Sequence, residues 1–370
     1  MPSTPTPADL FDRIASFENL HEAALEARKG KRYKDETARF HQRLGQNLVQ
    51  LRDELLSGAY QPGEYRTFWI QEPVRRQISA APYRDRVVHH ALCRVTQPLL
   101  ERSFIFDSYA NRTGKGTHAA LDRCTEYARR FQYVLQCDIR LFFPSIDHGI
   151  LLDALTRRIG EENGPALRLI AAILGNSNPQ PPADFYFPGD LLWTPGERRK
   201  GLPIGNLTSQ LWANFYLDPF DHFIKDRQRA PGYVRYVDDF LIFSDDKAWL
   251  HDLLDKSRER LAPLRLLLHP RKCRLYPVSE GIPFLGFRVF PRHRRLPADS
   301  VTRAGRRLRR LAARYHAGEV GTKEVRQSVH AWIAHASHGD TTGLRRTMLR
   351  AIPFRASGRN KESAGRLVEQ

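Results

Sequence analysis

The chain has 370 residues, a formal net charge of +18 at pH 7 and a pI near 10.1. With 41% hydrophobic and 10% aromatic residues, the composition excludes a disordered chain. No apolar run approaches the roughly 18 residues that a membrane span needs, and the first residues show no signal-peptide pattern. The four cysteines form no CxxC pair, which argues against a disulfide scaffold or a cysteine-rich zinc site. We therefore expect a cytoplasmic protein with reduced thiols and no membrane partner.

The excess of basic residues is the first functional indication. A high pI across a whole globular chain points to a polyanionic partner, and the basic residues are mostly arginines, which suit bidentate contacts to phosphate. The alternative is a basic but merely solvated surface. We favour nucleic acid as the partner, although the charge does not distinguish RNA from DNA.

Hydrophobic periodicity and breaker residues predict alternating helices and strands along the chain. The expected elements of the first half are helices over 10–30 and 31–60, extended chain over 61–78, a helix over 84–103 that ends near Pro98, a helix from Thr117, a strand from Tyr133, helices over 147–175 and a proline-rich loop over 176–200. Those of the second half are an amphipathic helix from Asn206 to Arg229 with Asn206 as N-cap, two short strands around an acidic turn over 232–244, a helix over 246–262, a strand pair ending near Phe290 and basic helices after Arg292. The antiparallel hairpin among these elements predicts an α+β fold.

Acidic residues stand at the ends of two apolar strands. Asp238 and Asp239 lie between strong strand formers, so the two carboxylates meet at a hairpin turn, where a divalent cation would relieve their repulsion. Asp138 ends the strand that begins at Tyr133. Each feature alone has a plain alternative, a soluble turn or a helix cap. Together with the basic charge they predict a polymerase site, in which two Mg²⁺ ions join the carboxylates to a nucleoside triphosphate.

Ordered motifs over roughly residues 65–290 resemble the catalytic core of reverse transcriptases. The matching segments are residues 75–78 (RRQI), 84–92 (RDRVVHHAL), 108–117 (SYANRTGKGT), 138–148 (DIRLFFPSIDH), 202–210 (LPIGNLTSQ), 236–239 (YVDD), 269–273 (HPRKC) and 284–287 (FLGF). The resemblance implies a right-hand polymerase. Its expected parts are an N-terminal extension over 1–30, fingers over 31–137 with part of 151–200, a palm with an antiparallel sheet over 138–293, and a basic helical thumb over 294–370.

The same resemblance implies roles for individual residues. Asp138, Asp238 and Asp239, with the carbonyl of Ile139, would bind two Mg²⁺ ions, which Mn²⁺ can replace. The aromatic ring of Phe143 would exclude a ribose 2′-hydroxyl and so favour dNTP substrates, although core packing is the alternative for it and for Phe142. Gln210, and either Arg75 or Arg76, are also expected to contact the nucleotide. The choice between the two arginines is open because Val74 stands where the family usually has a lysine.

Two further residues have competing interpretations. Lys272 is either the general acid toward pyrophosphate or part of a solvated basic face. Asp147 is expected to cap a helix and not to bind metal.

The resemblance and the charge pattern also imply contacts to an RNA template and to the RNA–cDNA duplex. Six arginines and no acid lie between Arg303 and Arg314, a pattern that predicts a helical stripe along a phosphate backbone. For Trp332 we expect core packing, and for His335 and His338 a solvated face. The residues expected to bind nucleic acid are Arg112, Lys115, Phe284, Gly286, Arg303, Arg306, Arg307 and Arg310.

Within the family, Ser209-Gln210 and the helical tail are similar to the enzymes of diversity-generating retroelements. That similarity implies error-prone copying at adenines of a structured template-repeat RNA, together with a small, basic, oligomeric accessory protein. The alternatives are an antiphage-defence, retron or group II intron-like reverse transcriptase, an RNA-directed RNA polymerase, and a non-catalytic RNA-binding factor with a polymerase fold.

Overall fold

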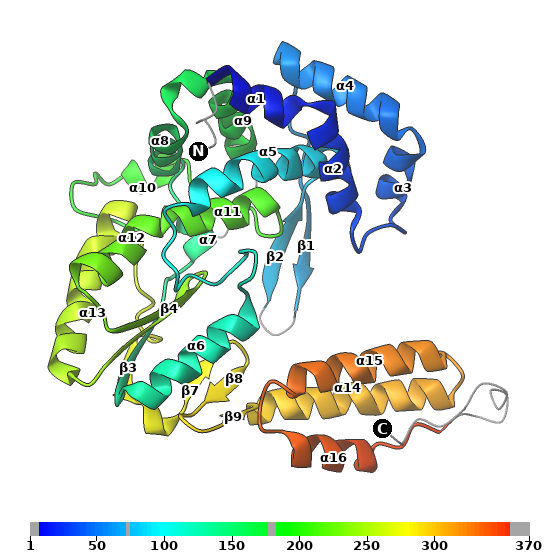
Figure 1. Ribbon diagram of the computed structural model, residues 1–370, viewed down its shortest axis with the longest axis vertical. Coiled ribbons are helices and arrows are strands. Elements are labelled where there is room, and N and C mark those ends of the chain that lie inside the picture. Colours follow the sequence, from blue (N-terminus) through cyan, green and yellow to red (C-terminus); the bar gives the residue numbers. More distant parts are fainter. Residues whose placement is uncertain (1–6, 72–74, 177–182, 356–370) are drawn as a thin grey trace, which may run out of the picture.

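The computed structural model describes residues 7–71, 75–176 and 183–355 and has an α+β architecture (Figure 1). An N-terminal helical part packs around one long central helix, whose buried face is rich in valine, alanine and leucine. The elements of this part are α1 (Pro7–Ala15), α2 (Phe17–Arg28), α3 (Asp35–Gln42), α4 (Leu44–Ser57) and the central helix α5 (Tyr83–Glu101).

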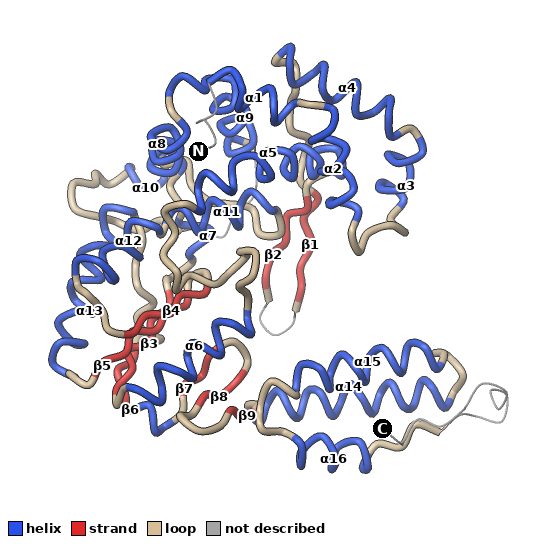
Figure 2. The backbone as a smooth tube through the Cα atoms, viewed as in Figure 1, coloured by secondary structure: helices blue, strands red, loops and turns tan. Residues whose placement is uncertain are grey.

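A two-stranded hairpin projects from this helical part (Figure 2). Its strands, β1 (Arg66–Ile70) and β2 (Arg76–Ala80), pair antiparallel, and every residue of β1 is exposed. The base of the hairpin is fixed by the loop that precedes α11, because Ser79 N–H donates to the Ile204 carbonyl at 3.0 Å.

A four-stranded antiparallel sheet in the order β4-β5-β3-β6 forms the centre of the fold. Its strands are β3 (Tyr133–Asp138), β4 (Gly232–Tyr236), β5 (Asp239–Ser244) and β6 (Arg274–Pro277). Side chains alternate between two buried clusters, so Leu135 and Ile242 enter one core while Val134 and Phe243 enter the other. Both faces of the sheet are therefore covered, which explains why its strands are apolar almost throughout.

Helices from the middle of the chain surround this sheet. α6 (Thr117–Arg130) contributes to the second core, whereas most of the others pack into the first. They are α7 (Phe142–Ser145), α8 (His148–Ile159), the 3₁₀ turn η1 (Glu161–Asn163), α9 (Gly164–Gly175), α10 (Thr194–Glu197), α11 (Leu207–Tyr216), α12 (Asp218–His222), the π-helical turn η2 (Phe223–Arg227), α13 (Lys247–Leu261) and the 3₁₀ turn η3 (Ala262–Leu264).

A small sheet connects the centre to a helical C-terminal unit. The 3₁₀ turn η4 (Val278–Glu280) precedes strands β7 (Ile282–Phe284), β8 (Phe287–Val289) and β9 (Arg294–Arg295), and helices α14 (Ala298–His316), α15 (Thr322–Ala336) and α16 (Thr342–Ala351) follow. Arg294 joins the two parts, because its guanidinium contacts Asp122 and Thr125 on α6, each at 2.7 Å, and its carbonyl accepts from Asp340 N–H. Figure 1 shows the C-terminal unit projecting away from the rest of the molecule.

Several predicted elements are confirmed and others need correction. The antiparallel hairpin at the acidic turn, the helix start at Thr117, the four free cysteines and the packing of Trp332 in a core are confirmed. The helix predicted to end near Pro98 instead runs through it to Glu101. The sequence also failed to predict α10 inside the proline-rich loop.

The expected long helix from Asn206 to Arg229 is wrong, because the segment divides into α11, α12 and a π-helical turn, with Pro219 at the start of α12. Asn206 occupies the N-cap position of α11, but its side chain does not cap the helix. It bonds instead to the β2 end, accepting from Ala81 N–H at 3.4 Å and donating to the Ser79 carbonyl at 2.9 Å.

Membrane insertion finds no support in the helices. Within the part of the chain that the structure describes, none is both long enough and apolar enough to cross a bilayer.

Replacing Gly205 tests the attachment of the hairpin. Gly205 has φ +114°, and an added Cβ would lie 2.9 Å from Ile78 Cγ2. We expect Gly205→Ala to lower the free energy of unfolding by about 1–3 kcal/mol, because alanine is strained in this backbone conformation. Urea denaturation measures the change. Gly45→Ala is the matched control, since nothing lies within 4 Å of its added Cβ, and it should leave stability unchanged or raise it. Equal stabilities of the two variants would contradict the prediction.

Candidate active site

Pairing of β3 with β5 brings the strand-end acids together. Asp138, the last residue of β3, is the register partner of Asp239, the first residue of β5. Asp238 precedes Asp239 in the turn, and its carbonyl accepts a hydrogen bond from Ile139 N–H at 3.2 Å. Residues a hundred positions apart in the sequence thus form one acidic site at an end of the central sheet.

The turn that carries Asp238 has an unusual backbone. Tyr236 pairs with Asp239, so Val237 and Asp238 form the two-residue connection between β4 and β5. Val237 has φ +59°, in the left-handed region that β-branched residues rarely adopt. A conformation of this kind persists only where the surroundings fix it, and it is typical of functional sites.

Burial and mutual repulsion perturb two of the three acids. Burial, with a smaller contribution from the Asp138 charge, raises the pKa of Asp238 to about 6. Burial, followed by the charges of Asp238 and Asp138, raises the pKa of Asp239 to about 7. Lys272 and Arg76 oppose both shifts but do not cancel them. The acids therefore repel one another strongly and would gain from an added cation.

Lys272 already contributes positive charge to this site. Its Nζ lies 2.9 Å from Asp138 Oδ2. The preceding segment runs beside the end of β3, where His269 N–H donates to the Asp138 carbonyl at 2.7 Å and Arg140 N–H donates to the Leu267 carbonyl at 2.8 Å. Of the two interpretations of Lys272, the contact with Asp138 favours a role in the site over a merely solvated face.

The acidic site fits divalent metal ions of the Mg²⁺ type. Within residues 7–71, 75–176 and 183–355, no group of three or more His, Cys, Asp or Glu side chains is placed to hold a metal ion by itself. Mg²⁺ does not need such a cage, because it retains water and takes oxygen ligands from substrate phosphates beside one or two carboxylates. Three carboxylates and the nearby carbonyl of Ile139 are hard oxygen donors of the kind it prefers.

The structure separates the two candidate arginines. The guanidinium of Arg75 lies over the ring of Trp69, 4.3 Å from the centroid. The charge of Arg76 acts instead on Asp238 and Asp239, whose pKa values it lowers. The charge of Arg76 thus acts on the acids, and which of the two arginines contacts the triphosphate stays a prediction. Val74, where the family's usual lysine would stand, lies outside the described residues.

The two phenylalanines that follow the first acid have different surroundings. Phe142 is 2% exposed and belongs to the core, whereas Phe143 is only partly buried. The two rings are in edge-to-face contact, with 5.6 Å between their centroids. The Phe143 carbonyl also accepts from Leu202 N–H at 2.9 Å, which joins α7 to the loop before α11. Gln210, also partly exposed, lies on α11. Asp147 caps α8 by accepting from Ile150 N–H, so its predicted structural role is confirmed.

Three of the residues expected to bind nucleic acid have internal roles. Arg112 donates to the carbonyls of Ile105 and Ser108 at 2.7 and 2.9 Å. Lys115 donates to the Phe106 carbonyl at 3.0 Å and lies over that ring. Phe284 is 2% exposed and packs in the second core. Burial leaves the Phe284 side chain little surface for such a contact, and the nucleic-acid contacts expected of Arg112 and Lys115 stay predictions.

The remaining expected contacts lie at the surface. Gly286, with φ +85°, forms the turn between β7 and β8 and lies near His335, whose ring is 5.1 Å from that of Phe287. The His338 ring stacks on the His118 ring, with 3.4 Å between their centroids, so His338 is only partly exposed, whereas His335 is exposed as the sequence predicted. One face of α14 lines a hollow of about 630 Å³, which Trp332 also borders. Four exposed arginines on this face are among the residues expected to bind nucleic acid: Arg303, Arg306, Arg307 and Arg310.

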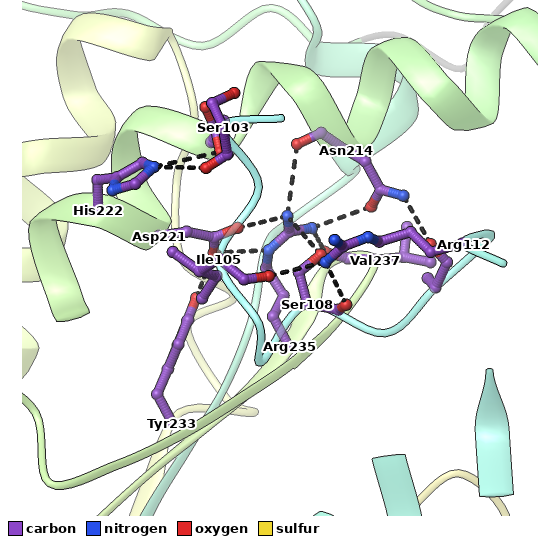
Figure 3. A network of polar contacts seen from close by, with 12 residues as sticks. Ser103, Ile105, Ser108, Arg112, Asn214, Asp221, His222, Tyr233, Arg235 and Val237 are labelled. Carbon is purple, nitrogen blue, oxygen red and sulfur yellow. Dashed lines mark hydrogen bonds and ion pairs between the residues drawn. The ribbon is translucent and has the colours of Figure 1, made fainter. Parts of the chain in front are cut away.

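A buried arginine that the sequence did not predict lies beneath the acidic turn. Arg235 lies two positions before Val237 and forms an ion pair with Asp221, and the side chains of both residues are 1% exposed (Figure 3). The available signal was a charged residue inside an otherwise apolar strand, in the segment GYVRYVDD.

Comparison with known proteins gives a consistent family. The family model described as reverse transcriptase (RNA-dependent DNA polymerase) matches residues 72–289. Protein YkfC of Escherichia coli (strain K12) is 28% identical over 295 residues, which are 68% of this chain and 74% of that protein. A putative COX1/OXI3 intron 2 protein of Saccharomyces cerevisiae is 20% identical over 339 residues, 73% of this chain and 37% of that protein.

Solved structures with similar folds are more distant. Apo telomerase from Candida tropicalis, truncated from its C-terminal domain, has a TM-score of 0.47 at 12% identity over 66% of this chain and 59% of that chain. A partial Cas6-RT-Cas1–Cas2 complex has a TM-score of 0.40 at 20% identity over 70% of this chain and 45% of that chain. The chain thus spans about half the length of these solved chains, and we draw no conclusion from likenesses at these scores.

Removing metal should expose the repulsion among the acids as a pH dependence. The folded pKa values of Asp238 and Asp239 lie above the ordinary value of 3.8. Between about pH 4 and pH 7 the folded chain therefore holds more protons than the unfolded chain, so the free energy of unfolding falls as pH rises. In EDTA, we expect Asp238→Asn/Asp239→Asn to become more stable than wild type by about 1–3 kcal/mol across this window. Denaturation at each pH measures the difference.

Adding Mg²⁺ at pH 7.5 should stabilise the wild type and leave the double variant unchanged. A stability difference between the two proteins that does not vary with pH in EDTA would refute this view of the site.

Proposed function

The chain belongs to the reverse transcriptase (RNA-dependent DNA polymerase) family, and on that premise we propose that it copies an RNA template into cDNA at the acidic end of its central sheet. The observation that carries this proposal is the register pairing of Asp138 with Asp239, with Asp238 beside them and Lys272 in contact with Asp138. A binding protein without chemistry has no need of three mutually repelling carboxylates in a chain of net charge +18.

We assign the metal site to the three carboxylates and the carbonyl of Ile139. When bound there, two Mg²⁺ ions, or Mn²⁺ in their place, would supply activation of a primer 3′-hydroxyl and neutralisation of the leaving pyrophosphate. Because burial raises the pKa values of Asp238 and Asp239, these two acids would give up any protons they hold when cations bind. The Lys272 ammonium contacts Asp138 and would be able to bind the triphosphate where metal ions neutralise that carboxylate.

The chain's other residues orient and select the nucleotide. The Arg76 guanidinium, on strand β2 of the hairpin, binds the triphosphate as a bidentate donor. Lys272 carries a proton that it can give to the departing pyrophosphate oxygen. Phe143, partly exposed next to the buried Phe142, excludes a 2′-hydroxyl, so dNTPs are the substrates. Gln210 on α11 completes the nucleotide contacts.

The nucleic acid lies, in this proposal, between the hairpin and the C-terminal unit. We assign residues 31–137, with part of 151–200, to fingers, 138–293 to a palm and 294–370 to a thumb, after an N-terminal extension of 1–30. Exposed arginines of α14 follow the phosphate backbone of the RNA–cDNA duplex. At the β7–β8 turn, the backbone around Gly286 makes the contact with nucleic acid, because the Phe284 side chain is buried.

We further propose the error-prone role in a diversity-generating retroelement, supported by Ser209-Gln210 and the tail helices. Its partners would be a structured template-repeat RNA and a small basic accessory protein. A group II intron-like enzyme is the second candidate, favoured by one observation: intron-encoded proteins of yeasts and a plant intron maturase are among the chain's relatives.

Primer extension on RNA with Mg²⁺ and dNTPs tests the activity. We expect wild type to synthesise cDNA and Asp238→Asn to lose at least 10³-fold of the rate, because the metal site loses a carboxylate. Asp147→Asn is the matched control, since asparagine caps a helix as well as aspartate does, and it should retain activity. Incorporation by Asp238→Asn at the wild-type rate would disprove the assignment of the site.

Sequencing the cDNA from the same reactions separates the two lineages. Errors concentrated at template adenines would support the diversity-generating role. Faithful cDNA would favour the intron-like enzyme and leave the polymerase assignment intact.

Substituting Phe143 tests nucleotide selection. We expect Phe143→Ala to raise NTP incorporation relative to dNTP incorporation by at least tenfold, because removing the ring opens space for the 2′-hydroxyl. Single-nucleotide insertion kinetics measure the ratio. Phe142→Leu is the control, which should reduce stability but leave the ratio unchanged, because Phe142 packs in the core. An unchanged ratio in Phe143→Ala would remove the selective role from this residue.

A further inference from the structure

The buried ion pair beneath the acidic turn is fully satisfied. Arg235 Nε donates to Asp221 Oδ1 at 2.7 Å and Nη2 donates to Oδ2 at 2.6 Å, which is bidentate geometry. Tyr233 adds a hydroxyl donor to Asp221 Oδ1 at 2.8 Å. Asp221 belongs to α12, so the pair joins that helix to β4 across the first core.

The other guanidinium hydrogens reach three different segments. Arg235 Nη1 donates to the Val237 carbonyl at 3.0 Å and to Asn214 Oδ1 at 3.2 Å, while Nη2 also reaches Ser108 Oγ at 3.3 Å. Figure 3 shows these partners converging on one guanidinium from different parts of the chain. Every N–H group of the Arg235 side chain therefore has an acceptor, and one of these acceptors is the carbonyl of Val237, the turn residue in the left-handed conformation.

The backbone of Arg235 is held as firmly as its side chain. Its N–H donates to the Asp107 carbonyl at 2.9 Å, and its carbonyl accepts from Tyr109 N–H at 3.0 Å. The loop 107–109 thus covers the outer edge of β4. Arg112 and Asn214 fix that loop in turn, through the Ser108 and Ala110 carbonyls.

Stability alone does not account for this arrangement. A buried ion pair contributes little net stability, and well-packed apolar residues often replace one without loss. An apolar residue, however, cannot donate to the Val237 carbonyl. That carbonyl belongs to the residue with φ +59°, directly before Asp238. The arginine thus supplies a hydrogen bond at the point where the backbone conformation is least favourable.

We propose that Arg235, held by Asp221, is a positioning residue that fixes the Val237 turn and thereby sets the affinity of the acidic site for divalent metal. The proposal rests on the proposed function for its metal site, and it names a residue that acts through the backbone without touching metal or nucleotide. Losing the hydrogen bond lets the turn relax, so Asp238 and Asp239 no longer share one fixed placement with Asp138.

Metal binding without nucleic acid provides the test. The main variant is Arg235→Met/Asp221→Leu, which removes both charges and retains apolar volume. Its midpoint of urea denaturation should stay near that of wild type. Binding of Mn²⁺ alone, followed by electron paramagnetic resonance, should weaken at least tenfold. Arg235→Lys is the second variant: it keeps a cation for Asp221 but lacks the second nitrogen needed for Val237, and it should weaken Mn²⁺ binding similarly.

A destabilised control separates positioning from general loss of structure. Leu51→Ala removes a buried side chain of α4 and should lower stability by about 2–5 kcal/mol while leaving Mn²⁺ affinity unchanged. In primer extension, the Arg235 variants should need about tenfold more Mg²⁺ for half-maximal rate, and the rate at saturating Mg²⁺ should remain within a few-fold of wild type.

The possible outcomes are distinct. Wild-type Mn²⁺ affinity in folded Arg235→Lys would overturn the positioning role, as would an equal loss in Leu51→Ala. If wild type binds Mn²⁺ and the Arg235 variants bind it more weakly, but no protein extends a primer, the positioning role stands and the polymerase proposal fails.

Discussion

The antiparallel pairing of β3 with β5 is the constraint on which the rest of this molecule depends. It sets Asp138 opposite Asp239. Because the register is fixed to a single residue, both acids lie at the same end of the sheet. A shift by one position would turn Asp138 toward the other face and exchange the residues of the two cores. The alternation of Val134 and Leu135 between those cores holds the register, so hydrophobic packing far from the acids determines where the acids are.

The electrostatics of the site follow from this placement. Burial raises the pKa of Asp238 and of Asp239, and the positive charges of Lys272 and Arg76 oppose the shift without cancelling it. One of these cations arrives on the segment after η3 and the other on the hairpin. The positive charge that opposes the acids is therefore supplied by elements outside the β3–β5 pair, and an added cation would relieve the repulsion that remains.

The sequence predicted the parts of the molecule that depend on local pattern. Alternating apolar residues and the acidic turn were sufficient for β4, β5 and the placement of Asp238, and the Asp147 cap followed from its position before a helix. The long helix after Asn206 was wrong because tertiary contacts override local propensity there: the Asn206 side chain bonds to the hairpin base, and the segment bends at Pro219. Burial of Phe284 depends on partners that are distant in the sequence, and the bonds of Arg112 to the Ile105 and Ser108 carbonyls depend on how the loop over 105–112 folds, so no motif spacing reveals either. The Arg235 pair was missed for the same reason, since Asp221 carries no mark of its partner.

The Arg235 network also bears on how the chain folds as it is made. Its partners come from residues 103–112, 214–222 and 233–237, while the acid pairing spans β3 to β5 and the balancing lysine follows at 272. Contacts of such large sequence separation form late, because the entropy of closing long loops must be overcome first. An unfinished chain on the ribosome holds Asp138 long before it holds Asp238, Asp239 or Lys272. A chain that is still being made therefore completes the acidic site only after Lys272 has been added and the centre of the fold has closed.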